Sequence, residues 1–331
     1  MSSATLATAA QLQTLVAVAE AGSVGGAALR LGRTQSAVSH SLAELERRMR
    51  LQLVVRDHRG ARLTPAGRRA LARARDVLVL LESLPDDARA GDELVGRVRL
   101  ATFRSVATHL LPTVHGALAR LHPGVELEVD DGCHERGDVE ERLLSGAADL
   151  AVAHLPVSDV LIARPLLADP YVLVAPADWS ISDPVRWSEV DGRPYLELAC
   201  SGARSVVERC RAAGLTAPVA MRLVEDSTVL AMVADGHGFS ILPRLATHPP
   251  SPRIRVAALP VPAQRSLGVV SRPSRTFIPA VRGVRELLLD AELLRAVPVV
   301  AERVVEPAPH DFAPSRVSLP AGSTEIPTTG P

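Results

Sequence analysis

Four polar residues lie close together at the start of a predicted helix and have the chemistry needed to contact the edges of nucleic-acid bases. Gln35, Ser36, Ser39 and His40 can all donate or accept hydrogen bonds without a fixed charge. Apolar residues recur between them at helical spacing, so these polar side chains are left on the outer face, near the helix N-terminus. A recognition helix contacts base edges from those positions. The pattern predicts direct contact with duplex DNA.

Arginines surround this helix, and a guanidinium suits contact with phosphate or entry into the minor groove. The candidates are Arg33, Arg56, Arg59 and Arg62, with Thr34 among them as a predicted helix cap. The alternative is a basic surface that is merely solvated. The whole chain has 37 basic and 37 acidic residues and a formal net charge of zero. Residues 1–75 nevertheless hold twelve arginines against four acidic residues, which predicts a basic DNA-binding head on an acidic body.

The elements that must position these residues follow from periodicity and capping. One helix is expected over 11–21, a second from its cap at Ser23 to Leu31, and a third after the turn glycine Gly32. Short apolar pieces over 52–63 surround a turn and predict a two-stranded hairpin. Together they predict two helices around a tight turn, followed by a wing.

A longer helix starts at Thr64-Pro65, and apolar residues keep three- and four-residue spacing as far as Leu84. Pro85 and the acidic stretch after it are expected to end the helix and form a linker. An isolated helix would leave its apolar stripe in water, so we expect it to pack against a second copy of the chain. The alternative is packing onto its own DNA-binding domain.

From residue 97 onward, strand-like and helix-like segments alternate, which predicts parallel sheets with helices on both faces. The expected strands are 97–102, 125–130, 149–153, 171–175, 195–199, 219–224, 239–242, 254–259 and 267–271. The expected helices are 105–121, 136–146, 202–213, 227–235 and 277–295. Residues 298–331 are rich in proline without periodicity and are predicted to be disordered.

Several classes of protein are excluded by what the sequence lacks. No apolar run approaches the ~20 residues that span a membrane, and no secretory signal pattern is present, so a cytoplasmic protein without a membrane partner is expected. Three cysteines suit a reducing compartment. No nucleophile elbow, phosphate-binding loop, dinucleotide fingerprint or metal-ligand cluster is found. We therefore expect no enzyme, no cofactor and no metal.

The chain resembles the LysR-type transcriptional regulators over nearly its whole length. The residues that carry the N-terminal resemblance are Gly22-Ser23, Ala27-Ala28, Leu31, Gln35, Ala37-Val38-Ser39, Leu45-Glu46, Arg56 and Leu63-Thr64-x-Ala66-Gly67. Ordered but weaker similarities follow, such as Gly146-x-x-Asp149-Leu150-Ala151 and Ile241-Leu242-Pro243. The chain departs from the family pattern at Arg50, where a glycine is common.

The resemblance implies an α/β fold with an N-terminal α-helical, winged helix-turn-helix domain over 1–64. A linker helix and hinge would cover 65–96, and an effector-binding domain 97–297. That domain would consist of two doubly wound α/β subdomains like a type 2 periplasmic binding protein. The first subdomain would be 97–164 plus 266–296, and the second 165–265.

An effector pocket is expected between these subdomains, where strands end and helices begin and exposed N–H groups favour anions. The candidate residues are Thr102, Arg104, Ser105, Ser201, Arg204, Ser227 and Phe239. Arg104 and Arg204 would pair with a carboxylate of an anionic effector, although a surface arginine on a loop is an equal alternative. The serines are equally well explained as helix caps.

The resulting hypothesis is a transcriptional regulator that binds double-stranded promoter DNA as a homodimer or homotetramer, responds to a small-molecule effector and can contact RNA polymerase. A thiol-based sensor is an alternative, because the family's peroxide sensor has a cysteine pair near Cys200 and Cys210. There the spacing is nine residues, whereas here it is ten, and a buried inert cysteine is the more common case. A binding-protein-like enzyme with an added DNA-binding domain is the third possibility.

Overall fold

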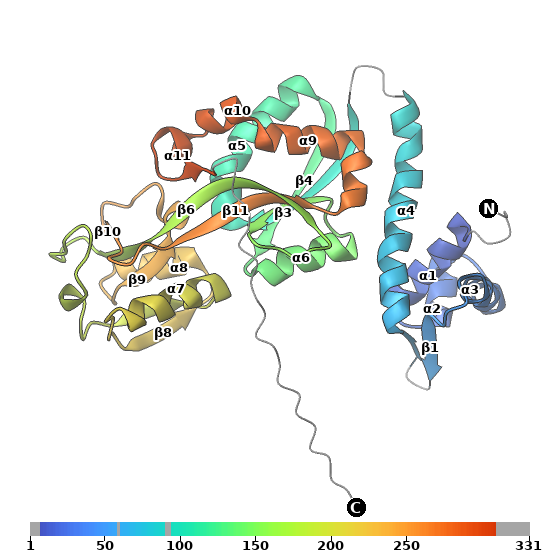
Figure 1. Ribbon diagram of the computed structural model, residues 1–331, viewed down its shortest axis with the longest axis horizontal. Coiled ribbons are helices and arrows are strands. Elements are labelled where there is room, and N and C mark those ends of the chain that lie inside the picture. Colours follow the sequence, from blue (N-terminus) through green and yellow to red (C-terminus); the bar gives the residue numbers. More distant parts are fainter. Residues whose placement is uncertain (1–6, 58–59, 90–93, 309–331) are drawn as a thin grey trace, which may run out of the picture.

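The computed structural model describes residues 7–57, 60–89 and 94–308. Its N-terminal part is a small head that packs on one side of a long helix, and a larger α/β body lies on the other side (Figure 1). The elements of the head and long helix are α1 (Ala9–Ala21), α2 (Val24–Leu31), α3 (Gln35–Met49), β1 (Val54–Asp57), β2 (Gly60–Leu63) and α4 (Pro65–Arg89). This is the expected winged helix-turn-helix followed by a linker helix.

Local capping explains why the head folds as the sequence predicts. The Ser23 hydroxyl accepts a hydrogen bond from the Gly26 N–H, and the Thr34 hydroxyl accepts one from the Ala37 N–H. Gly32 ends α2 with a φ of 60°, in the left-handed region that glycine adopts without strain. α3 ends in the same conformation at Arg50, with a φ of 52°, although arginine has a Cβ that disfavours it.

The linker helix α4 is longer than expected. It continues through Pro85 as far as Arg89, whereas the sequence suggested that Pro85 ends it. Its N-terminal half packs on the head, where the Arg75 guanidinium donates to the Glu20 carboxylate at 3.1 Å. Three apolar side chains further along the helix remain exposed: Val77 at 44%, Leu81 at 43% and Leu84 at 55%.

The body contains the expected strands and helices with shifted ends, except that the one helix expected over 277–295 is two helices separated at Asp290. Its strands are β3 (Val95–Phe103), β4 (Gly124–Cys133), β5 (Leu150–His154), β6 (Ile162–Pro176), β7 (Tyr195–Leu198), β8 (Val219–Leu223), β9 (Ser240–Pro243), β10 (Ile254–Ala258), β11 (Gln264–Ser271) and β12 (Glu306–Pro307). Its α-helices are α5 (Arg104–Leu121), α6 (Arg136–Ser145), α7 (Ser201–Ala212), α8 (Asp226–Ala234), α9 (Pro279–Leu289), α10 (Ala291–Ala296) and α11 (Pro298–Ala301). Short 3-10 turns include η3 (Arg244–Thr247) and η4 (Pro273–Phe277).

The sheets are mixed rather than all parallel as predicted. β3 pairs in parallel with β4 and β5, and β7 pairs in parallel with β8, whereas β6 and β11 pair antiparallel with each other and with their other neighbours. Alternation of strands and helices could not reveal this, because β6 and β11 cross between the two halves of the body instead of returning after a helix.

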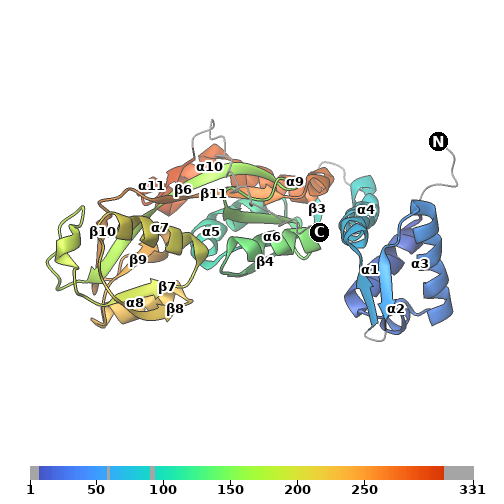
Figure 2. The ribbon, with the colours of Figure 1, turned by 60° about the horizontal axis from the view of Figure 1, so that its bottom comes forward.

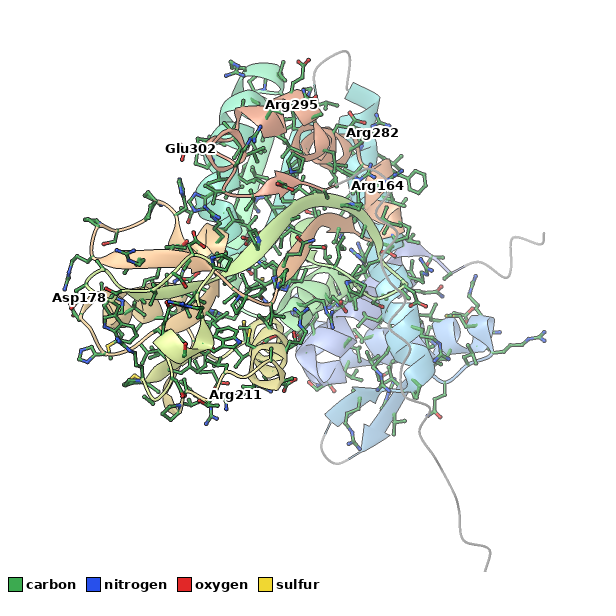
Figure 3. The ribbon with its side chains drawn as sticks, turned by 60° about the vertical axis from the view of Figure 1, so that its left-hand side comes forward. Arg164, Asp178, Arg211, Arg282, Arg295 and Glu302 are labelled. Carbon is green, nitrogen blue, oxygen red and sulfur yellow. The ribbon has the colours of Figure 1, made fainter. Side chains whose placement is uncertain are left out.

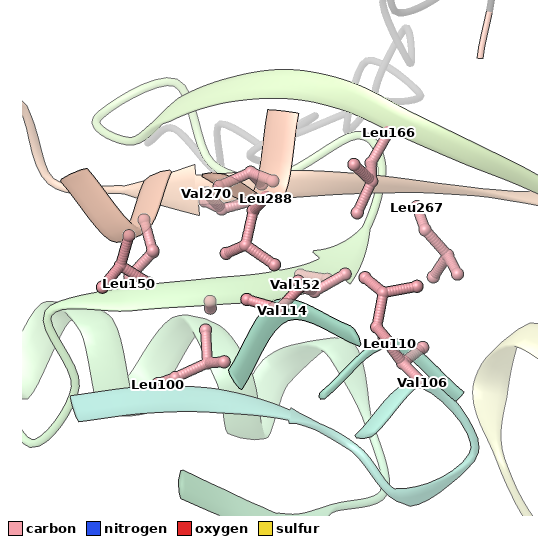
Figure 4. Packing of buried hydrophobic residues seen from close by; sticks show 14 of the residues in the cluster. Leu100, Val106, Leu110, Val114, Leu150, Val152, Leu166, Leu267, Val270 and Leu288 are labelled. Carbon is pink, nitrogen blue, oxygen red and sulfur yellow. The ribbon is translucent and has the colours of Figure 1, made fainter. Parts of the chain in front are cut away.

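Two separate hydrophobic cores define the two subdomains. The first includes Leu100, Leu110 and Leu150, which interdigitate between sheet and helices in Figure 4. The second runs from Tyr171 to Leu259 and includes the wholly buried Phe239. Leu166 and Leu167 pack in the first core. The bounds expected from the sequence assigned these two leucines to the second subdomain.

The expected disorder from residue 298 is wrong for residues 298–308. Pro298 occupies the first turn of α11, Val299 is 1% exposed, and β12 pairs antiparallel with β6. Proline content suggested a loop, but proline is well tolerated in the first turn of a helix. The rest of that tail lies outside the described residues. Within the described ranges, no helix is both long and apolar enough to cross a membrane.

Candidate DNA-binding surface and interdomain cleft

The helix α3 presents the polar row that the sequence predicted. Gln35, Ser36 and His40 are exposed and Ser39 is half-buried, whereas Val38, Leu42 and Leu45 on the opposite face are wholly buried. Figure 2 shows α3 on the side of the head that faces away from the body. An exposed row of hydrogen-bonding groups at the start of an outward-facing helix can reach the base edges in a major groove.

The wing formed by β1 and β2 is fixed to α3 by specific hydrogen bonds. One oxygen of the Glu46 carboxylate accepts the N–H groups of Leu53 and Val54 at 2.7 and 3.0 Å. Gly67 is needed beside this strand, because a Cβ there would lie 2.0 Å from the Leu53 carbonyl oxygen. The exposed Arg56 guanidinium donates to the Ser39 hydroxyl at 3.1 Å. The wing and the polar row therefore form one surface.

Arginines extend this surface on both sides of α3. Arg33, Arg56 and Arg62 are all exposed, and Thr34 is exposed while it caps α3. Arg59 lies outside the described residues. The positions that the sequence assigned to DNA contact and that the structure describes therefore lie together on the wing and at the start of α3.

The body has a small cleft between its two subdomains. About 60 Å³ of space is lined from the first subdomain by residues that include Arg104, Ser105 and His134, and from the second by residues that include Cys200 and Glu225. That volume holds a few water molecules and is well below the roughly 300 Å³ at which small-molecule pockets begin. The two subdomains are therefore closed upon each other.

An ion-pair bridge closes the mouth of the cleft. Glu225 precedes α8 in the second subdomain, and its carboxylate pairs with the Arg104 guanidinium of the first subdomain. The His134 imidazole, also in the first subdomain, lies 3.7 Å from the same carboxylate. Separating the subdomains would break this bridge.

A buried network lies behind the cleft and joins the two crossing strands. The Arg265 guanidinium on β11 donates to the Asp169 carboxylate on β6 at 2.7 Å and to the Ser105 hydroxyl at 3.0 Å. A third contact joins Arg265 Nη1 and His154 Nε2 at 3.2 Å. Asp169 is wholly buried and also accepts the Leu245 N–H at 3.1 Å.

The His154 imidazole is neutral in this network. Burial, followed by the charge of Arg265, lowers its pKa to about 3. A guanidinium can only donate hydrogen bonds, so His154 Nε2 must be the acceptor and the ring proton must lie on Nδ1. The cleft therefore contains a fixed, uncharged imidazole next to a paired arginine.

Comparison with known proteins decides the family. The model of the bacterial regulatory helix-turn-helix protein, lysR family, matches residues 9–68. The model of the LysR substrate binding domain matches residues 91–292, which is more than half of the chain. The chain belongs to the LysR family.

Curated relatives of this LysR-type regulator are similar over most of their length. One is the probable HTH-type transcriptional regulator LrrA of Synechococcus elongatus, 33% identical over 84% of this chain and 95% of the relative. Another is a probable hydrogen peroxide-inducible genes activator of Mycobacterium avium, 32% identical over 81% of this chain and 88% of the relative. These matches establish a LysR-type transcriptional regulator with an effector-binding domain.

Solved structures agree on the architecture. A full-length OxyR variant from Pseudomonas aeruginosa has a TM-score of 0.65 at 23% identity, covering 88% of this chain and 96% of that one. The LysR-family regulator CbnR has a TM-score of 0.52 at 22% identity, covering 85% of this chain and 99% of that one. At this identity the likeness supports the winged head and α/β body as a fold.

The structure places few of the predicted effector residues on the cleft of this regulator. Only Arg104 and Ser105 line it, while Arg204 and Ser227 are exposed elsewhere. The buried Thr102 hydroxyl donates a hydrogen bond to the Val152 carbonyl oxygen at 3.3 Å, which joins β3 to β5. The side chain of Ser201 is not among those that the structure describes. Of the two predicted arginines, Arg104 lines the cleft, and its guanidinium is already paired with the Glu225 carboxylate.

Phe239 is a core residue, not a cleft residue as predicted. It is wholly buried and packs against Tyr195, with ring centroids 5.4 Å apart. The preceding residue, Gly238, brings the chain so close to Pro194 that a Cβ would lie 2.3 Å from the Pro194 carbonyl oxygen. The glycine serves packing, so Phe239 points inward.

Sequence reasoning missed Asp169, Arg265 and His154. Arg265 is 96 positions from Asp169 and 111 positions from His154 in the sequence, and no local motif surrounds any of the three. The available signal was a charged residue shortly before each of the expected strands 171–175 and 267–271. Both residues lie near the expected subdomain boundaries at 164–165 and 265–266, so paired charges at those boundaries could have been inferred.

The two cysteines of the redox hypothesis lie at opposite ends of α7. Cys200 caps the helix, and its sulfur accepts the Ala203 N–H at 3.4 Å, whereas Cys210 is wholly buried near the other end. Ten residues of helix separate them by about 15 Å, against the ~4.4–6.8 Å between Cα atoms of a disulfide. Burial also raises the pKa of Cys200 and raises that of Cys210 to about 11, which keeps both as thiols.

Proposed function

We propose that this regulator binds a roughly palindromic promoter site with α3 in the major groove and the wing arginines on the flanking phosphates. The observation that carries this proposal is the shared surface of α3 and the wing, where Arg56 donates to Ser39. Gln35 and Ser36 would contact bases, while Arg33 and Arg62 would hold the phosphate backbone. Such a function places the protein in the cytoplasm and requires no catalytic residue.

The exposed apolar stripe of α4 would bring a second copy of the chain to the other half of the palindromic site. Val77, Leu81 and Leu84 are spaced by four and three residues and are each more than 40% exposed. That spacing matches the apolar seam of a helix pair. We propose that two chains associate along this seam as a homodimer, which can pair further into a tetramer.

The cleft would supply the control of DNA binding. An effector that enters between the subdomains must compete with the Arg104–Glu225 pair, which bridges them. The effector can shift the arrangement only by its difference in affinity for the open and closed states. Because Arg104 is already paired, an anionic effector would replace Glu225, whereas a cationic effector would replace Arg104.

The DNA-binding proposal is tested by fluorescence anisotropy with fragments recovered by the purified protein from its own genome. We expect Gln35→Ala to reduce discrimination between cognate and unrelated DNA. Arg33→Gln should weaken binding to both and make it less dependent on salt. Arg295→Gln, on the exposed rim of the body, is the matched control. Salt-insensitive binding by the unaltered protein would contradict the proposal.

The dimer proposal is tested separately by sedimentation. Leu81→Glu should shift the protein toward the monomer and weaken its binding to a two-half-site fragment more than to a single half-site. Leu121→Glu changes another exposed leucine on the body and should leave the assembly intact. An unchanged assembly in Leu81→Glu would exclude α4 as the dimer seam.

A further inference from the structure

Five buried hydrogen-bond donors that have no acceptor among the described residues are concentrated in residues 271–275. They are Nε and Nη2 of Arg272, Nε of Arg275 and the hydroxyls of Ser271 and Ser274. Arg272 is 4% exposed and Arg275 is 2% exposed. Buried polar groups in proteins nearly always have a partner, so five donors in five residues need an explanation.

The neighbouring carboxylate cannot supply the missing acceptor. One Asp149 oxygen accepts a hydrogen bond from Arg99 Nη2 at 3.0 Å and forms an ion pair with Arg275 Nη1 at 2.9 Å. The other accepts from the Arg99 N–H and Nε at 3.0 and 3.1 Å. This one carboxylate therefore accepts three hydrogen bonds from Arg99 and pairs with Arg275, yet its charge balances only one of the two guanidinium groups.

The linker helix contributes one further carboxylate and one further arginine. Asp76 on α4 pairs with Arg272, which joins α4 to the body through a buried contact. A Cβ on Gly146, at the end of α6, would lie 3.4 Å from Arg272 Nη2, 3.7 Å from Arg275 Nη2 and 3.7 Å from Arg75 Cδ. Arg75 is paired with Glu20, so Arg99, Arg272 and Arg275 share the two aspartates Asp76 and Asp149.

A cavity opens directly beside this cluster. It has about 320 Å³, the size of a small-ligand pocket, and shares no residue with the interdomain cleft. Arg97, Arg99 and Arg275 line it, and so do the carboxylates of Asp149 and Glu82. Val79 of α4 and Ile278 of the body are among its apolar residues. Both the linker helix and the body contribute to its wall.

The electrostatic state of the arginines agrees with a missing anion. Burial, opposed in part by Asp149, lowers the pKa of Arg275 to about 10, and burial likewise lowers the pKa of Arg272. Positive charges on Arg99 and Arg272 add to the lowering at Arg275. An anion in contact with these groups would remove part of that repulsion.

We propose that the junction of α4 and the body is a second ligand site that binds a small oxyanion, a phosphate or carboxylate group. The oxyanion would accept hydrogen bonds from Arg275 and Arg99, and an apolar body attached to it would lie against Val79 and Ile278. Because the wall comes from both parts, the bound anion would hold α4 against the body. The site is independent of the effector cleft.

The test is isothermal titration of the full-length protein with orthophosphate and with hexyl phosphate at constant ionic strength. The unaltered protein should bind one anion per chain. Arg275→Gln should weaken this binding by at least about tenfold, the scale of a lost charge-assisted hydrogen bond. Arg295→Gln, on the rim of the body (Figure 3), should change it by less than about twofold.

The outcomes separate the proposal from its alternatives. Tighter binding of hexyl phosphate indicates an organic ligand, whereas equal binding indicates inorganic phosphate, and both support an oxyanion site. No binding, or an equal loss in Arg295→Gln, would overturn the proposal. If Arg275→Gln does not fold, crystals of the unaltered protein grown with selenate decide the matter. Anomalous density between Arg99 and Arg275 supports the site, and density only elsewhere refutes it.

Discussion

The substitution Asp169→Asn tests whether the buried network between the crossing strands holds the two subdomains together. Asp169 is wholly buried and Arg265 is 9% exposed, so the change leaves a guanidinium without its counter-charge in the interior. Breaking a buried ion pair in this way costs about 3–5 kcal/mol. Arg265 retains its contacts with Ser105 and His154, so we expect the lower end, about 3 kcal/mol.

That loss is large enough to measure directly. For a unit of this size, 1 kcal/mol corresponds to roughly 2–4 °C, so the Tm of the body should fall by about 6–12 °C. Both tryptophans of the chain, Trp179 and Trp187, lie in the second subdomain and report its unfolding by fluorescence. Urea titration of the same variant gives the change in the free energy of unfolding.

The matched control is Asp235→Asn, which breaks the exposed pair of Asp235 with Arg253. Those side chains are 56% and 63% exposed, and pairs of that kind contribute about 1 kcal/mol or less. If the two variants lose similar stability, the reasoning about the buried network is refuted. The double variant Asp169→Asn with Arg265→Gln should recover part of the loss, because no uncompensated charge then remains.

Three further predictions concern protonation, backbone strain and thiol chemistry. His154 has a folded pKa of about 3, well below its unfolded value, so the unfolded chain takes up a proton first as the pH falls from about 6.5. Stability should therefore drop by up to about 1.4 kcal/mol per pH unit below 6.5, and His154→Gln should remove that part of the slope in urea titrations at pH 7 and pH 5. Arg50→Gly should stabilise the protein by about 1 kcal/mol, because glycine adopts the left-handed conformation of Arg50 without the Cβ penalty; calorimetry that finds it destabilised would show that the arginine side chain compensates. Low doses of peroxide should leave Cys200 and Cys210 reduced in mass spectrometry, and a disulfide between them would mean that α7 unwinds during function.

The head of this protein could be predicted from sequence because local signals specify it. Ser23, Gly32 and Thr34 act on groups within five residues of themselves, so capping rules placed the turn and the recognition helix correctly. Helical periodicity then separated the exposed polar row from the buried face. Arg50 shows the limit of such reasoning, since a family pattern favours glycine there and the chain uses the same backbone conformation without it.

The cleft could not be predicted in the same way, because its contacts join distant positions. Arg104 and Glu225 are 121 residues apart, and Asp169 and Arg265 are 96 residues apart. Serines and arginines at predicted helix starts were reasonable candidates, but Arg204 and Ser227 lie off the cleft. Residues 298–308 were misjudged from composition, since the burial of Val299 and Val300 outweighs the proline content.

The path of β6 and β11 has a consequence for the order in which the body can fold on the ribosome. The second core is made by one continuous stretch, Tyr171 to Leu259, whereas the first core needs residues from Val98 to Val305. Domains usually fold in N-terminal order during synthesis. Here all core residues of the inserted subdomain have been synthesised about 45 residues before those of the enclosing subdomain are complete. The part of the body translated first is therefore the last that can close.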